Sequence, residues 1–149
     1  VATNIEKFQN KRLRVLLADD AEFNLDLLSD YLSKIPTSDI LRANNGKKAF
    51  DRYVEINQQG KKIDLVVTDY DMPMLNGKGL VEKIRAFEKE NNLTECTIIM
   101  ISGNDNDHNM IRDLLNPRGE HRVAKFMTKP ILYLSSWRLL LKASICNLT

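Results

Sequence analysis

Four short polar motifs follow apolar runs in this sequence, and they carry the groups that phosphoryl chemistry beside a metal ion requires. Asp19 and Asp20 follow the run L-R-V-L-L-A, and Asp69 closes the run D-L-V-V-T-D. Ser102 follows T-I-I-M-I, and Lys129 follows A-K-F-M-T. Because short apolar runs of this kind are typical of buried parallel strands, the motifs should share the edge where the carboxyl ends of the strands meet. We therefore expect three carboxylates, a hydroxyl and an ammonium to converge on one crevice.

The predicted crevice would suit Mg²⁺ and the transfer of a phosphoryl group. Clustered carboxylates cannot all stay ionised unless a cation neutralises them. Mg²⁺ prefers oxygen ligands and often binds through one or two carboxylates together with phosphate oxygens. A carboxylate such as Asp69 can act as a nucleophile and form an aspartyl phosphate, while the Lys129 ammonium and the Ser102 hydroxyl would contact phosphate oxygens. The residue types thus predict a catalytic set of Asp69, Lys129 and Ser102, with Mg²⁺ as the cofactor.

Strand-like and helix-like patterns alternate five times along the chain. The expected strands are 13–18, 39–43, 63–68, 97–101 and 123–127. A helical pattern follows each strand, and the last, at 132–145, is apolar over much of its circumference, which favours a buried helix over a partner-binding face. Strict alternation predicts the α/β class, with a single doubly wound parallel sheet, right-handed crossovers and helices on both faces.

Length and composition narrow the class of protein. With 149 residues, 43% of them hydrophobic and 28% charged, the chain suits one globular domain. The formal charge of +2 is scattered, so we expect no nucleic-acid groove, and no apolar stretch approaches the roughly 20 residues of a membrane span. Cys96 and Cys146 lack metal-ligand spacing, which favours reduced thiols in the cytoplasm, and His108 and His121 are expected to be exposed. Residues 1–11 are polar and unpatterned, which indicates a linker or an N-terminal tail.

Together the motifs resemble the receiver domain of two-component response regulators, over about residues 12–146. The matching residues are Asp19-Asp20 with Asn24, Asp69 in D-Y-D-M-P with Gly77, Ser102, Phe126 and Lys129-Pro130. The resemblance implies a flavodoxin-like fold with strand order 2-1-3-4-5. Two features depart from the family pattern: the segment 116–122 is longer and more polar than usual, and the first ten residues have no counterpart.

The resemblance also implies a role for individual acidic residues. Mg²⁺ would be ligated directly by Asp20, Asp69 and the backbone carbonyl of Asp71. Asp19 would act on the metal through water. Asp69 would be the phosphoacceptor, and its donor would be a histidine kinase or a histidine phosphotransfer protein.

Ser102 and Phe126 would form a switch that responds to the phosphoryl group. The added charge would draw Ser102 inward, and Phe126 would rotate into the space that this vacates. The face made by the fourth helix, the fifth strand and the fifth helix would then change its affinity for a partner. Such a domain is a self-phosphorylating phosphoacceptor, reset by water attack, rather than a conventional enzyme. We expect a monomer or a weak dimer, and the sequence does not name its downstream effector.

Other interpretations fit part of the pattern. A Mg²⁺ phosphatase of the haloacid-dehalogenase type also carries D-x-D at a strand end, as in Asp69-Tyr70-Asp71, but its last acidic pair lies downstream, whereas Asp19-Asp20 lies upstream. A receiver-like module that binds partners without phosphorylation is disfavoured by the intact acidic and basic motifs. The N-terminal tail and the first residue, which is not Met, favour the receiver of a hybrid sensor histidine kinase over a stand-alone receiver.

Overall fold

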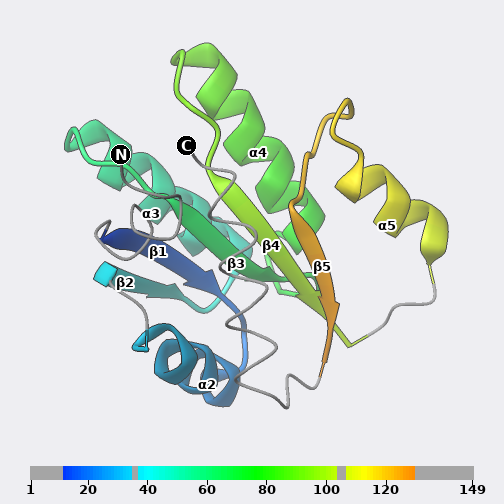
Figure 1. Ribbon diagram of the computed structural model, residues 1–149, viewed down its shortest axis with the longest axis horizontal. Helices are drawn as coiled ribbons and strands as arrows, with labels where there is room; N and C mark the ends of the chain where they lie inside the picture. The colour runs from blue at the N-terminus through cyan, green and yellow to red at the C-terminus, as the bar shows by residue number, and fades with distance from the viewer. Residues whose placement is uncertain (1–11, 35–36, 104–106, 130–149) are drawn as a thin grey trace, which may run out of the picture.

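The computed structural model describes residues 12–34, 37–103 and 107–129, so the predicted N-terminal tail and last helix lie outside the described residues. Its strands are β1 (Leu13–Ala18), β2 (Thr37–Ala43), β3 (Leu65–Asp69), β4 (Thr97–Ser102) and β5 (Lys125–Thr128). All of them pair in parallel, in the order β2-β1-β3-β4-β5 (Figure 1). The predicted α/β class and the flavodoxin-like strand order are thus confirmed.

Helices cover both faces of this sheet. In the described ranges they are α2 (Glu22–Leu32), α3 (Gly46–Gln58), α4 (Gly77–Glu90) and α5 (His108–Leu115). Figure 1 shows α3 and α4 on one face and α2 on the other. Successive side chains of a strand point to opposite faces, so Val66 joins the core under α3 and α4, whereas Leu65 and Val67 join the core under α2. Within these ranges no helix is both long and apolar enough to cross a bilayer.

Side chains cap the start of three helices. Asn45 caps α3, Asn76 caps α4 and Asp107 caps α5, and each accepts a hydrogen bond from a backbone N–H of the first turn. Helix α2 differs, because its N-cap position is Ala21 and no side chain caps it. The acidic pair that precedes α2 is therefore not the cap of this helix.

The strands lie within two residues of their predicted bounds, and β5 shows why small differences arise. It begins at Lys125, after Val123 and Ala124, which the apolar pattern assigns to the strand. The chain reaches β5 from a turn in which Arg122 has a φ of +50°. A non-glycine residue in this left-handed region ends regular extended structure, so the ladder starts later than the pattern indicates.

His121 corrects one expectation from the sequence. His108 is exposed as expected, whereas only 7% of His121 is exposed. The His121 Nε2 atom lies 3.0 Å from Glu82 Oε1 on α4. A polar partner of this kind satisfies a ring nitrogen that would otherwise lose hydrogen bonds to water, which explains how the ring is buried.

Candidate active site

Three carboxylates meet at the carboxyl ends of neighbouring strands. Asp19 and Asp20 follow β1, and Asp69 ends β3, which pairs with β1 so that Ala18 lies opposite Thr68. One ligand oxygen from each carboxylate lies within 4.8 Å of the other two. Asp19 and Asp69 are buried and Asp20 is exposed. The parallel register of two strands thus brings together acids that are far apart in the sequence.

Lys129 brings a positive charge to this cluster from the far end of the sheet edge. Its Nζ atom lies 3.2 Å from Asp19 Oδ2 and 3.2 Å from Asp69 Oδ1. The residue directly follows β5, and its backbone N–H donates to the carbonyl of Ser102 over 2.8 Å. The β4–β5 pairing therefore determines where the ammonium lies.

The charges of the cluster are not balanced. Burial, followed by the negative charge of Asp19, raises the pKa of Asp69 from 3.8 to about 6, although Lys129 acts to lower it. Burial alone would lower the pKa of Lys129, but the carboxylates of Asp19 and Asp69 outweigh burial and raise it. One ammonium thus faces three carboxylates, and this surplus of hard oxygen ligands fits a divalent cation such as Mg²⁺.

Local hydrogen bonds hold Asp19 in place. Its Oδ1 atom accepts from the backbone N–H of Ala21 over 2.9 Å and from Asn24 Nδ2 over 3.4 Å. Its Oδ2 atom is the one that contacts Lys129. The asparagine that follows the acidic pair in the sequence motif therefore helps to orient one member of that pair.

The loop after β3 is fixed tightly at its ends. The Tyr70 N–H donates to the Ile101 carbonyl over 2.9 Å, and the Gly77 N–H donates to the Tyr70 carbonyl over 2.7 Å. A Cβ atom at position 77 would lie 2.5 Å from the Asp69 carbonyl oxygen, so only glycine permits this approach. Asp71 lies within the loop and its side chain is exposed.

The two predicted switch residues lie on adjacent strands beside the cluster. Ser102 ends β4 and is 1% exposed, and it pairs with Thr128 of β5. Phe126 lies opposite Met100 and is partly buried against the core under α3 and α4. Their movement, the carbonyl ligation by Asp71 and the water-mediated role of Asp19 stay predictions.

The residues that the sequence places at the site therefore lie close together in the structure. The side chains of Asp19, Asp20, Asp69 and Lys129 come together, and Ser102 lies at the same sheet edge. Pro130 lies outside the described residues. Sequence reasoning missed a second polar cluster around Arg85 and Glu88, which are 6% and 2% exposed. Its only signal was spacing: Arg85 follows Val81, and Glu88 follows Ile84, by one helical turn on the inward side of α4.

Comparisons with known proteins agree with this arrangement. A family model described as the response regulator receiver domain matches residues 15–133. The chemotaxis protein CheY1 of Helicobacter pylori is 32% identical over 90 residues, which are 60% of this chain and 67% of that protein. The match covers 14% of the 3',5'-cyclic-nucleotide phosphodiesterase regA of Dictyostelium discoideum, at 29% identity and over 85% of this chain, and 73% of the two-component response regulator ORR42 of Oryza sativa, at 32% identity and over 70% of this chain.

Two solved structures illustrate the likeness in fold. The co-crystal structure of the Saccharomyces cerevisiae histidine phosphotransfer signalling protein Ypd1 and the receiver domain of its response regulator Ssk1 contains a chain with a TM-score of 0.73 and 21% identity, covering 92% of this chain and 91% of that chain. A CheX–CheY–BeF₃–Mg²⁺ complex from Borrelia burgdorferi gives a TM-score of 0.71 and 24% identity, covering 88% of this chain and 87% of that chain.

Proposed function

This chain belongs to the family of response regulator receiver domains, and we propose that it accepts a phosphoryl group on Asp69 in a Mg²⁺-dependent reaction. As a receiver domain it serves two-component phosphorelay signalling. The observation that carries the proposal is the contact of the Lys129 ammonium with both Asp19 and Asp69, within a cluster of three carboxylates. A phosphoryl group that arrives at this edge would meet a nucleophile, a metal site and a fixed cation together.

The acidic residues have two roles: they bind the metal, and one of them attacks the phosphorus. Mg²⁺ held by Asp20, Asp69 and the Asp71 carbonyl, with Asp19 acting through water, would supply positive charge to the phosphoryl oxygens. An Asp69 carboxylate oxygen attacks the phosphorus of a phosphohistidine and forms a new P–O bond. The P–N bond breaks, its electron pair stays on the imidazole nitrogen, and that ring takes a proton from water.

Lys129 and Ser102 stabilise the group as it is transferred. The Lys129 ammonium neutralises one phosphoryl oxygen as a compact charge, and it also opposes the rise in the pKa of Asp69, which keeps the nucleophile ionised. The Ser102 hydroxyl donates a hydrogen bond to another phosphoryl oxygen. The backbone of both residues already lies at this sheet edge before the donor arrives, and phosphoryl transfer depends mainly on positioning and charge.

The phosphoryl group then changes which partner the domain binds. Its charge of about −1.5 to −2 draws Ser102 toward it, and Phe126 rotates into the space released. The face formed by α5, β5 and the predicted last helix shifts between two states of different affinity. Water that attacks the phosphorus breaks the P–O bond to Asp69, releases inorganic phosphate and restores the carboxylate.

The partners follow from the same chemistry. The donor is a histidine kinase or a histidine phosphotransfer protein, and the similar fold in the complex with Ypd1 supports this class of donor. The similar fold in the complex that contains BeF₃ and Mg²⁺ supports the metal in the same way. A cytoplasmic location and a monomer or weak dimer complete the proposal, and the downstream partner is unassigned.

Transfer of a labelled phosphoryl group tests this function. A phosphorylated histidine phosphotransfer protein would be mixed with the wild type, with Asp69→Asn and with Asp51→Asn, a control that removes an exposed carboxylate of α3. We expect label on the wild type and the control only, and only with Mg²⁺. Label on Asp69→Asn at normal stoichiometry would exclude Asp69 as the acceptor. Turnover of p-nitrophenyl phosphate would instead support the phosphatase interpretation.

A further inference from the structure

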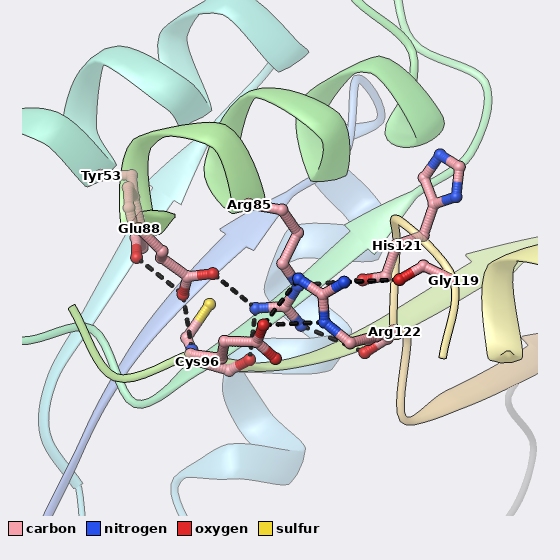
Figure 2. A network of polar contacts seen from close by, with 8 residues as sticks. Tyr53, Arg85, Glu88, Cys96, Gly119, His121 and Arg122 are labelled. Carbon is pink, nitrogen blue, oxygen red and sulfur yellow. Dashed lines mark hydrogen bonds and ion pairs between the residues drawn. The ribbon is translucent and has the colours of Figure 1, made fainter. Parts of the chain in front are cut away.

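A second polar cluster is buried at the amino ends of the strands, opposite the edge that carries Asp69. Arg85 Nη1 lies 2.7 Å from Glu88 Oε1, and both side chains belong to α4 (Figure 2). Glu88 Oε2 accepts from the Tyr53 hydroxyl over 3.0 Å and from the Cys96 N–H over 2.6 Å. Burying an ion pair in this way is costly, because the charges lose their water. Nothing in the phosphoryl chemistry accounts for this pair.

Arg85 is directed at backbone carbonyls that precede two strands. Its Nε donates to the His121 carbonyl over 2.9 Å and its Nη2 to the Arg122 carbonyl over 3.1 Å, both in the chain that leads into β5. Its Nη1 also donates to the carbonyl of Cys96, directly before β4, over 3.0 Å. One planar guanidinium therefore fastens the beginnings of β4 and β5 to the same helix.

Among the described residues, few buried side chains set the register of β5, although the N–H groups of Val123 and Ala124 also donate to the carbonyls of Leu114 and Ile98 over 2.8 Å. Strand β5 has four residues, none of them fully buried, whereas all six residues of β4 are buried. A strand without a strongly buried face specifies its pairing weakly, and a slip of one residue turns every side chain to the opposite face. The preceding turn also holds Arg122 at a φ of +50°, a conformation that persists only where its surroundings enforce it.

The other end of β5 carries residues on which the phosphoacceptor site depends. Phe126 pairs with Met100, and Thr128 pairs with Ser102. Lys129 follows, its N–H donates to the carbonyl of Ser102, and in this register its ammonium contacts both Asp19 and Asp69. A slip at the beginning of the strand would therefore displace the cation at its end.

We propose that Arg85 is a positioning residue for phosphoryl transfer. By holding the carbonyls before β4 and β5 at a fixed distance from each other, it sets the register of β5 and thereby places Lys129 beside Asp69. The inference rests on the proposed function of these two residues. Two further contacts, His121 with Glu82 and Arg122 with Glu95, hold these carbonyls less firmly, because both glutamates are exposed and solvent screens their charge.

Arg85→Lys tests the inference, because lysine keeps the charge but cannot span several carbonyls as a planar fork. Phosphorylation by acetyl phosphate with Mg²⁺ would be timed in the wild type, Arg85→Lys, Lys129→Met and the double variant. Arg52→Lys, on α3 and with 41% of its side chain exposed, is the matched control. We expect Arg85→Lys to slow phosphorylation by between about tenfold and a hundredfold, as misplaced groups do, with Mg²⁺ affinity unchanged. In the Lys129→Met background the same substitution should change the rate by less than about twofold.

Amide hydrogen exchange gives a second readout, since the amides of Lys125–Thr128 should exchange faster in Arg85→Lys than in the control. If Arg85→Lys does not fold, Glu88→Gln takes its place, because it keeps the side-chain shape and removes the charge that orients Arg85. Equal slowing with and without Lys129, or no slowing, would overturn the positioning role. A wild type that takes up no phosphoryl group, or a Lys129→Met variant as fast as the wild type, would instead refute the proposed function.

Discussion

Replacing Asp69 with asparagine should stabilise the metal-free protein at neutral and alkaline pH. The ionised carboxylate is buried beside Asp19, and this raises its pKa from 3.8 to about 6. A group whose pKa is higher in the folded state binds its proton more tightly there, so folding is favoured at low pH. That advantage is lost as the pH rises through the folded value. Asparagine has the same shape and no charge, and it avoids this loss.

The size of the effect follows from the two pKa values. A rise from 3.8 to about 6 corresponds to roughly 3 kcal/mol of unfolding free energy lost between these pH values. For a chain of this length that is a difference of roughly 6 to 12 °C in Tm. The stability difference between Asp69→Asn and the wild type should therefore be small near pH 4, grow up to about pH 6 and stay constant above it.

Urea unfolding with a chelator present, from about pH 4 to about pH 8, would measure this difference. Asp113→Asn is the control, because its carboxylate is exposed and its loss should change the stability little at any pH. An Asp69→Asn variant that is no more stable than the wild type at about pH 8 would refute the reasoning. So would an advantage of the same size at every pH.

Three further results are expected. Lys129→Met should raise the pKa of Asp69 further, because the ammonium acts to lower it, and carboxyl NMR of the metal-free protein would measure the change. An unchanged midpoint would contradict the contact. Mg²⁺ at about a hundredfold excess over its Kd should stabilise the wild type by about 2.7 kcal/mol and stabilise Asp20→Asn far less; equal gains would exclude Asp20 as a ligand. Gly77→Ala should lower the free energy of unfolding by about 1 to 3 kcal/mol, because the new Cβ meets the Asp69 carbonyl. Gly103→Ala, where a Cβ has open space, should leave it unchanged. Equal unfolding curves for the two variants would show that the loop adjusts to the added Cβ.

Much of the site could be predicted because it depends only on strand ends. Asp69 and Ser102 each close an apolar run, and in a parallel sheet such ends share one edge whatever the details of packing. Asp19 follows the first strand and Lys129 follows the last, so the same rule places both residues at this edge. Alternation of strand and helix predicted a parallel sheet covered on both faces, since it leaves few ways to connect the strands, whereas the strand order followed from the resemblance to receiver domains.

The Arg85 cluster could not be predicted because the pattern treats charged residues as solvated. Arg85 and Glu88 are buried only because they satisfy each other and the carbonyls around them, and those carbonyls come from segments distant in sequence. The same is true of His121, whose partner lies on α4. The predicted start of β5 was two residues early for a related reason, since tertiary contacts rather than an apolar run hold the turn before it.

The central claim is that scattered residues form one phosphoryl site around Asp69, and beryllofluoride tests it most directly. Amide NMR spectra would be recorded with Mg²⁺ before and after beryllofluoride is added to the wild type and to Asp69→Asn. We predict shifts in the wild type around Asp69, Ser102, Phe126 and Lys129, and none in the variant. A wild-type spectrum that does not change, or equal changes in both proteins, would contradict the account.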